Sequence, residues 1–188
     1  MSIYSLPNAL SILRIILAVP VVIFLLNHQF FGAMIVFFFA GITDGLDGWI
    51  AKQYNCQSRL GSILDPAADK LLLVSSFITL YIIGLLPLWL LALIFFRDLM
   101  IVSGTIGSFM SSNEAENILL SPSKLSKINT AFQIALVLFL VTTGLYPNLS
   151  VWNTVFFIIV ATSTFLSGAD YIWIWMEKVI YKEKQKQK

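Results

Sequence analysis

Charged side chains are scarce in this chain. They make up 12% of its 188 residues, against about 25% in a typical soluble domain, and 58% of the residues are hydrophobic. So few polar groups cannot cover a water-exposed globule of this length. The composition therefore excludes an ordinary soluble protein and requires lipid to cover most of the surface.

Cysteine and histidine are each present only once. Cys56 alone excludes an intramolecular disulfide and any metal site built from paired cysteines, so we interpret it as a reduced, incidental thiol. His28 has no second histidine with which to share a metal ion, and it lies in the short polar stretch Asn27-His28-Gln29. We therefore expect a turn residue there rather than a ligand.

Long apolar runs occupy most of the chain. A bilayer core of about 30 Å needs about 20 apolar residues per helix. These runs do not alternate apolar with polar residues, which disfavours the strands of a membrane barrel. We expect an all-α integral membrane protein, a six-transmembrane-helix bundle in which residues 1–188 form a single membrane domain. The predicted spans are approximately 7–27, 30–51, 65–84, 86–110, 126–146 and 151–177.

Among the connections between these spans, only alternate ones carry basic residues. The second, the fourth and the C-terminal connections carry Lys or Arg, whereas the other three carry none. The positive-inside rule then places both termini in the cytoplasm. No cleavable targeting segment is apparent, so we expect a bacterial cytoplasmic membrane. The lysines after Tyr181 are interpreted as an anchor to an anionic leaflet rather than as a specific lipid site.

Four of the ten acidic residues fall between positions 44 and 69. Asp44 and Asp47 are three apart, and Asp65 and Asp69 are four apart, so each pair shares one face of a predicted helix. The short connection makes these helices antiparallel neighbours, and we expect the carboxylates to converge near the cytoplasmic end of the bundle. Carboxylates brought together in a membrane need a cation. Oxygen ligands without His or Cys suit Mg²⁺ or Mn²⁺.

A simpler alternative is that these carboxylates lie at the interface and pair with nearby bases. The available bases are Lys52, Arg59 and Lys70. Three bases do not neutralise four acids, and pairing does not explain the small residues among them. We therefore favour a metal site.

Small residues accompany the aspartates and leave the backbone bare. They are Gly45, Gly48, Ala51 and Gly61. Glycines in membrane helices often serve only helix packing. Here they bracket the carboxylates, which favours a planar ligand packed against the backbone.

The order of these residues resembles the signature of the CDP-alcohol phosphotransferase family. That signature is Asp-x2-Asp-Gly-x2-Ala-Arg, a gap, and Gly-x3-Asp-x3-Asp, and one fixed position differs here, with Lys52 in place of Arg. Lysine keeps the charge but lacks the bidentate fork, so diphosphate binding there is expected to be weaker or differently arranged. The stretch Pro7 to Arg14 also resembles the opening of the family. Family features extend to Gln133, whereas the last segment carries little beyond hydrophobicity.

The resemblance implies a metal-dependent enzyme that transfers a phosphatidyl group from CDP-diacylglycerol to a glycerol-containing phosphate acceptor and releases CMP. It implies two Mg²⁺ or Mn²⁺ ions, with Asp69 as the general base. The implied metal ligands are Asp44, Asp47, Asp65 and Asp69. The implied CDP-binding residues are Asp44, Gly48, Ala51, Lys52 and Gly61. The lipid bilayer is an expected partner, and nucleic acid is not.

The fourth and fifth predicted spans bear on the acceptor. Arg97-Asp98 and the run Ser126 to Gln133 resemble most the cardiolipin synthases of this family, whose acceptor is phosphatidylglycerol. Relatives that use glycerol 3-phosphate usually carry Glu at the position of Asp98 and Lys at the position of Asn129. That acceptor stays open as an alternative.

Arg97 is a charge within a predicted span, so we expect it to be functional. Pairing with Asp98 is not expected, because adjacent helix residues point in different directions. Arg97, Lys124 and Lys127 are the candidate residues for binding the phosphate of the acceptor.

Two other intramembrane charges have no settled interpretation. Arg14 can either snorkel to the headgroups or reach the site, and the sequence favours neither. Asp170, after Ser167-Gly168-Ala169, has no partner that the sequence identifies.

Two other protein classes remain. A cation transporter would use the carboxylates but would not need the lysine and glycines of a nucleotide site. A non-catalytic scaffold would need neither. Small residues on helix faces permit a homodimer without requiring one.

Overall fold

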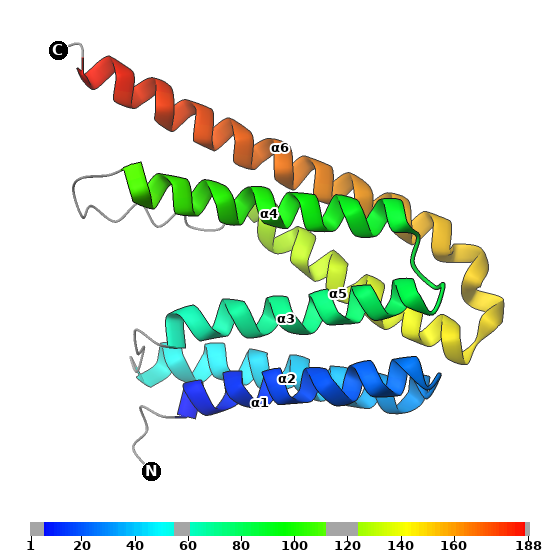
Figure 1. Cartoon of the computed structure of the whole chain (residues 1–188). Helices are drawn as coiled ribbons and strands as arrows, with labels where there is room; N and C mark the ends of the chain where they lie inside the picture. Colours follow the sequence, from blue (N-terminus) through cyan, green and yellow to red (C-terminus); the bar gives the residue numbers. More distant parts are fainter. Residues whose placement is uncertain (1–5, 55–60, 112–123, 187–188) are drawn as a thin grey trace. The chain divides into compact units, whose positions relative to one another are not determined.

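The computed structural model describes the backbone of residues 6–54, 61–111 and 124–186. Side chains are described over 12–43, 70–103, 125–173 and at Met176. The regular secondary structure of the described backbone is all helical, as predicted (Figure 1). It forms α1 (Leu6–Leu26), α2 (Phe30–Tyr54), α3 (Gly61–Ile82), α4 (Leu88–Ser111), α5 (Lys124–Leu145), the short 3₁₀ helix η2 (Pro147–Trp152) and α6 (Asn153–Lys186).

The helix ends differ most from the predicted spans in α3 and α6. Helix α3 begins at Gly61 rather than at 65, and α6 continues to Lys186 rather than ending at 177. Hydropathy detects an apolar run and not the backbone hydrogen bonds that define a helix. The polar C-terminal part of α6 is rich in Lys, Glu and Gln, which are good helix formers outside a membrane as well.

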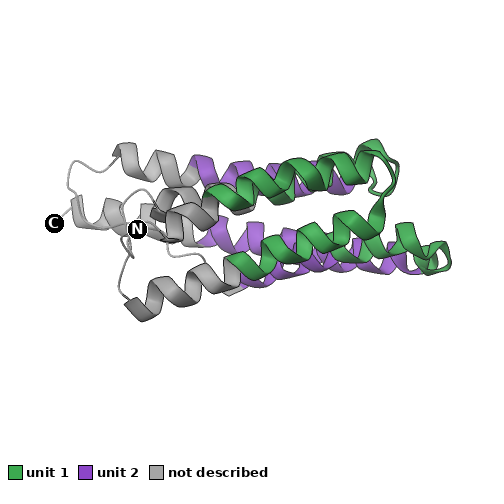
Figure 2. Cartoon of the chain, turned by 90° about the horizontal axis from the view of Figure 1, so that it is seen from below, with its two compact units in different colours: residues 1–87, 137–151 green, residues 88–136, 152–188 purple. Residues whose placement is uncertain are grey.

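The chain divides into two compact units (Figure 2). Unit 1 comprises residues 1–87 and 137–151, and unit 2 comprises residues 88–136 and 152–188. In unit 1, α1 packs against both α2 and α3. Their buried apolar side chains include Val21, Leu25, Phe37, Phe77 and Leu80.

Unit 2 is built on the packing of α4 against α6. Its buried apolar side chains include Leu90, Ile94, Leu136 and Val160. Its interior also holds a larger polar set, described below. Helix α5 contributes its N-terminal part, as far as Leu136, to unit 2 and its remainder to unit 1.

Helix α1 ends in a tight cap that explains the single histidine. The Gln29 N–H donates to the Phe24 carbonyl at 2.8 Å, and the His28 N–H donates to the Leu25 carbonyl at 3.0 Å. This pair of bonds is the Schellman arrangement, in which the residue after the helix adopts a left-handed conformation. His28 has φ of 56°. The prediction that His28 is a turn residue is confirmed.

Helix α3 ends in the same way, with glycine at the left-handed position. The Leu85 N–H donates to the Leu80 carbonyl at 2.9 Å, and the Gly84 N–H donates to the Tyr81 carbonyl at 3.0 Å. Gly84 has φ of 80°, a conformation that glycine adopts without a steric cost. Both caps end their helices, and the next helices begin at Phe30 and Leu88.

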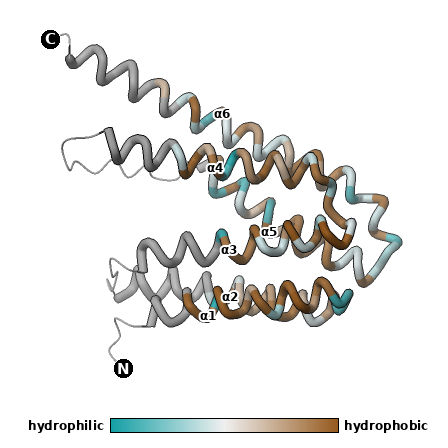
Figure 3. The backbone as a smooth tube through the Cα atoms, viewed as in Figure 1, coloured by the Kyte–Doolittle hydropathy of each residue, from teal (hydrophilic) through white to brown (hydrophobic). Residues whose placement is uncertain are grey.

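The exposed helix surfaces are largely apolar, and beside the apolar core the interior also holds polar side chains such as Arg14, Arg97 and Asn129. Large exposed hydrophobic side chains include Ile16, Phe38, Phe96, Phe165 and Trp173, and hydrophobic positions dominate α1 to α4 (Figure 3). Patches of this kind mark a surface covered by lipid or by another protein. The exposed surface is therefore consistent with a membrane protein.

Membrane-spanning length is met by part of the chain. Among the described residues, Leu125–Leu145 and Pro147–Trp173 are long and apolar enough to cross a membrane. Ile12–Leu26, Phe30–Thr43 and Lys70–Ile82 are shorter apolar stretches. All three shorter stretches belong to longer helices whose remaining side chains lie outside the described residues. Six spans therefore stay a prediction.

Candidate functional site

The aspartate motif lies on two consecutive helices of unit 1. Asp44 and Asp47 belong to α2, and Asp65 and Asp69 belong to α3. Each pair thus has the helical backbone that its spacing requires. The side chains of all four aspartates lie outside the described residues, so their convergence stays a prediction. As a donor set, four carboxylates fit hard divalent cations.

The predicted CDP-binding residues belong to the same two helices. Gly48, Ala51 and Lys52 lie in the C-terminal part of α2, and Gly61 is the first residue of α3. Their side chains also lie outside the described residues. The backbone therefore provides a helical frame for the motif, with α1 packed against both helices that carry it.

Arg14 lies in the interior of this unit. Its side chain is 1% exposed on α1, the helix that packs against α2 and α3. A side chain that snorkels to the headgroups would expose its charged end. Burial excludes that alternative and leaves Arg14 as an interior charge of the unit that carries the aspartate motif.

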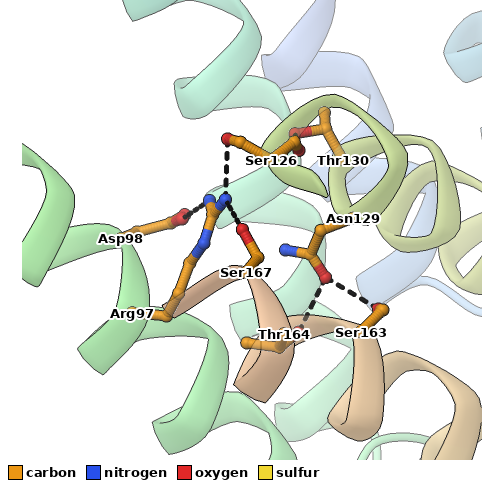
Figure 4. Close-up of polar contacts among 8 residues, drawn as sticks. All are labelled: Arg97, Asp98, Ser126, Asn129, Thr130, Ser163, Thr164 and Ser167. Carbon is orange, nitrogen blue, oxygen red and sulfur yellow. Dashed lines mark hydrogen bonds and ion pairs between the residues drawn. The ribbon is translucent and has the colours of Figure 1, made fainter. Parts of the chain in front are cut away.

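A second polar cluster lies in unit 2, around Arg97 (Figure 4). The guanidinium Nη1 contacts the Asp98 carboxylate at 2.9 Å, and both side chains are largely buried. The Nη2 donates to Ser126 of α5 at 2.7 Å and to Ser167 of α6. Arg97 thus connects α4 with two other helices.

The expectation that Arg97 and Asp98 do not pair is wrong. Neighbouring helix positions do diverge by about 100°, but the long arginine stem reaches back to the carboxylate next to it. Burial favours this ion pair, because an isolated charge in an apolar interior is far more costly than a paired one.

Asn129 forms the other half of the cluster and is completely buried. Its Oδ1 accepts hydrogen bonds from Ser163 at 2.8 Å and from Thr164 at 2.9 Å, both on α6. One turn further along α5, Gln133 is 1% exposed. Among the described residues, Asn129 Nδ2, Gln133 Nε2 and Arg97 Nε have no hydrogen-bond partner.

The hydroxyls of α6 were missed in the sequence, where the last segment was expected to carry little beyond hydrophobicity. Ser163, Thr164 and Ser167 supply partners to Asn129 and Arg97. The available signal was the grouping of several hydroxyl residues at helical spacing within one apolar run. Asp170 is half-buried further along α6, and nothing among the described residues explains it.

The lysines proposed to accompany Arg97 lie at the start of α5. Lys124 is its first residue, and its side chain lies outside the described residues. Lys127 is exposed in the first turn. The structure thus places Arg97 and Lys127 in one unit, with Arg97 buried and Lys127 at the surface.

Comparison with known proteins matches this chain to one protein family. The profile of the CDP-alcohol phosphatidyltransferase family matches residues 4–177. A probable cardiolipin synthase (CMP-forming) of Drosophila melanogaster is 37% identical over 165 residues, which cover 81% of this chain and 49% of that protein. The cardiolipin synthase (CMP-forming) of Homo sapiens is 38% identical over 149 residues, covering 71% of this chain and 49% of that protein.

A relative with a different name is also similar. The CDP-diacylglycerol--glycerol-3-phosphate 3-phosphatidyltransferase of Cereibacter sphaeroides is 33% identical over 150 residues, which cover 76% of this chain and 66% of that protein. The chain spans about half the length of these two cardiolipin synthases, 49% of each. The family match spans both units of the structure and includes the aspartate motif, as the sequence signature predicted. The chain belongs to the CDP-alcohol phosphatidyltransferase family.

Proposed function

We propose that this chain is a phosphatidyltransferase that uses CDP-diacylglycerol and releases CMP. The observation that carries the proposal is the complete set of family aspartates, with Asp44 and Asp47 on α2 and Asp65 and Asp69 on α3. The family match over residues 4–177 supports it. We propose that residues 1–188 act as one membrane domain.

The aspartates would hold two Mg²⁺ or Mn²⁺ ions. When bound, such ions neutralise the diphosphate charge and stabilise the departing CMP. Asp69 takes the proton of the acceptor hydroxyl as its oxygen attacks the lipid-linked phosphorus, and the bond from that phosphorus to the CMP oxygen breaks. Lys52 counters diphosphate charge, and the small residues let the nucleotide approach the backbone. These are Gly48, Ala51 and Gly61.

Phosphatidylglycerol is the acceptor that we propose, which makes the product cardiolipin. Asn129 is neutral, and the charge of Arg97 is already balanced by Asp98. A dianionic glycerol 3-phosphate requires more positive charge than a monoanionic phosphodiester does. Lys124 and Lys127 would supply the remaining charge for the acceptor phosphate. Glycerol 3-phosphate stays the second candidate, because the relative from Cereibacter sphaeroides carries that name.

We propose a cytoplasmic membrane location, with six spans and with both termini and the active site facing the cytoplasm. The distribution of basic residues supports this orientation. A nucleotide-linked donor and a released CMP both require a site that faces the cytoplasm. The apolar exposed faces of the helices support burial in lipid.

The decisive experiment is a transfer assay with the purified full-length chain. CDP-diacylglycerol is supplied with Mg²⁺ and either phosphatidylglycerol or glycerol 3-phosphate, and CMP and the lipid product are measured. We expect CMP release with cardiolipin formation, and loss of both in excess chelator. Consumption of glycerol 3-phosphate without cardiolipin would overturn the acceptor assignment alone. Absence of CMP release with every acceptor would overturn the enzyme assignment and favour a cation transporter.

A further inference from the structure

Hydrogen bonding in the interior of unit 2 differs from that in unit 1. In unit 1 the buried hydroxyls of Ser76, Thr79 and Thr143 donate to carbonyls of their own helices. Such bonds are local and need no partner from elsewhere. In unit 2 the buried side chains of Arg97 and Asn129 also bond to side chains of other helices. The polar interior of unit 2 therefore forms only when side chains from α4, α5 and α6 come together.

The orientation of the Asn129 amide follows from its partners. The Thr164 hydroxyl donates to Asn129 Oδ1 at 2.9 Å, so this oxygen is the atom of the amide that faces α6. The Ser163 hydroxyl also contacts Oδ1, at 2.8 Å, while contacting the Val160 carbonyl at 3.0 Å. With the oxygen held by α6, the amide N–H₂ points away from these hydroxyls, to the side where Ser167 is drawn in Figure 4.

The donor of Asn129 has a matching neighbour on the same helix. Gln133 lies four residues later, so the two side chains occupy the same face of α5. Both are essentially fully buried, and the N–H₂ group of neither has a partner among the described residues. An unpaired buried donor is costly, and buried polar groups in native proteins nearly always have a hydrogen-bond partner. These two donors are therefore candidates for binding a ligand or an ordered water.

The charge around these donors limits the ligand. Arg97 is balanced by Asp98, so the cluster as described carries no net charge. Neutral amide donors suit oxygens of hydroxyl, ester or monoanionic phosphodiester groups, whereas a phosphate dianion would require added cations. A phospholipid headgroup with a glycerol and a phosphodiester presents only such oxygens.

We propose that Asn129 and Gln133 form a neutral binding subsite for the phosphodiester and glycerol oxygens of the lipid acceptor, with Thr164 and Ser163 as positioning residues for Asn129. This inference rests on the proposed function, since it names the part of the acceptor that this site binds. CDP-diacylglycerol, the lipid donor, offers similar oxygens. The KM for phosphatidylglycerol and the KM for CDP-diacylglycerol, measured separately, show which of the two lipids the subsite binds.

The test compares apolar, near-isosteric variants of the full-length chain. Asn129→Leu and Gln133→Leu remove the donors, and the hydroxyls freed on α6 can return to backbone carbonyls of their own helix. Each variant should raise the KM for phosphatidylglycerol about 10-fold or more, the loss expected for one hydrogen bond to a charged group. The KM for CDP-diacylglycerol and kcat at saturating acceptor should stay within about twofold, well below the effect of a lost hydrogen bond.

The controls separate binding from folding. Thr143→Val removes a buried hydroxyl from the same helix, where it donates to the Leu140 carbonyl, and should leave both KM values unchanged. Thr164→Val should raise the KM for phosphatidylglycerol by less than Asn129→Leu does, and Thr164→Ser should restore it. An unchanged KM in both leucine variants overturns the proposal, as does a rise confined to CDP-diacylglycerol. A parallel fall in kcat and Tm would also overturn it by showing a purely structural role.

A binding measurement keeps this test independent of turnover. Short-chain phosphatidylglycerol is titrated into the purified protein and followed by tryptophan fluorescence, with short-chain phosphatidylcholine as the comparison. Binding that is lost in Asn129→Leu supports the subsite even when no transfer is found, in which case only the proposed function fails. Transfer by the wild type with undiminished binding in Asn129→Leu overturns the subsite and leaves the proposed function standing.

Discussion

At the scale of single residues, the buried ion pair of α4 is the feature that the sequence predicted least well. Sequence spacing indicates which Cβ atoms are neighbours, and by that criterion Arg97 and Asp98 diverge. It does not indicate how far a long side chain bends. The hydroxyls that complete the cluster come from α5 and α6, so its composition depends on helix packing that no local pattern contains.

The Arg97–Asp98 pair gives a stability prediction. Asp98→Ala should destabilise the protein by about 3–5 kcal/mol, because it leaves a buried guanidinium without its counter-charge. Thermal unfolding of the purified protein in detergent measures the effect. Asp170→Ala is the matched control and should cost much less, since Asp170 is a half-buried acid for which the described residues show no such pair. Equal losses of stability in the two variants would show that the ion pair contributes no more to stability than an unpaired acid does.

The aspartate motif gives a prediction for activity. Asp44→Asn, Asp47→Asn and Asp65→Asn should each abolish CMP release, because each removes a hard ligand from a site whose role is charge neutralisation. Their thermal unfolding should stay close to that of the wild type. Asp170→Asn, a carboxylate outside the motif, serves as the control and should retain activity. Normal turnover in any of the three motif variants would contradict the metal assignment.

At the scale of helices, the sequence predicted the number and order of the elements better than their ends. Long apolar runs mark helices of membrane length, and all six predicted spans correspond to helices. The ends of α3 and α6 depend on backbone hydrogen bonds formed by polar residues, which hydropathy does not register. The turn at His28 was predicted from its polar surroundings, although the left-handed conformation was not.

The cap of α3 gives a prediction about glycine. Gly84→Ala should lower stability by about 1–2 kcal/mol, because it places a Cβ atom in the left-handed region. Gly41→Ala is the control: Gly41 is helical, and among the described residues no atom beyond its own helix backbone lies within 4 Å of an added Cβ, so this change should be neutral or stabilising. Unfolding midpoints of the two variants in the same detergent check the difference. A Gly84→Ala variant as stable as the wild type would argue against this cap.

A second glycine tests packing within unit 1. A Cβ atom added at Gly144 of α5 would lie 2.6 Å from the Phe30 ring of α2, closer than real contacts allow. Gly144→Ala should therefore destabilise the protein, by about 1–3 kcal/mol as in other overpacked sites. Phe30→Leu should relieve part of that cost when combined with it. Additive losses in the double variant would show that the two positions do not touch.

At the scale of the whole molecule, the orientation across the membrane is a testable consequence of the charge distribution. In a chain whose Cys56 is replaced by Ala, single cysteines introduced in the uncharged connections should react with an impermeant reagent from outside. Those introduced in the basic connections should react only after the membrane is opened. The external set is Asn27, Leu86 and Asn148, and the internal set is Gln57, Ser121 and Gln187. External labelling at Gln57 would contradict a cytoplasmic active site.

The division between the units limits what the sequence could predict about the candidate site. The signature aspartates lie in unit 1, and a regular spacing on two consecutive helices was enough to identify them. The polar cluster of unit 2 joins α4, α5 and α6, and its members are distant in sequence. No spacing rule connects Asn129 with Thr164, so only the folded chain brings them together.

The pairing of Arg97 with the very next residue has a consequence for biogenesis. A ribosome delivers helices to the membrane one after another, and α4 emerges before Ser126 and Ser167 have been made. Because the arginine carries its counter-ion on its own helix, the charge is already balanced when α4 meets the translocon. If α4 spans the bilayer as proposed, its insertion need not wait for the later helices. Those helices then add hydroxyl contacts to a pair that has already formed.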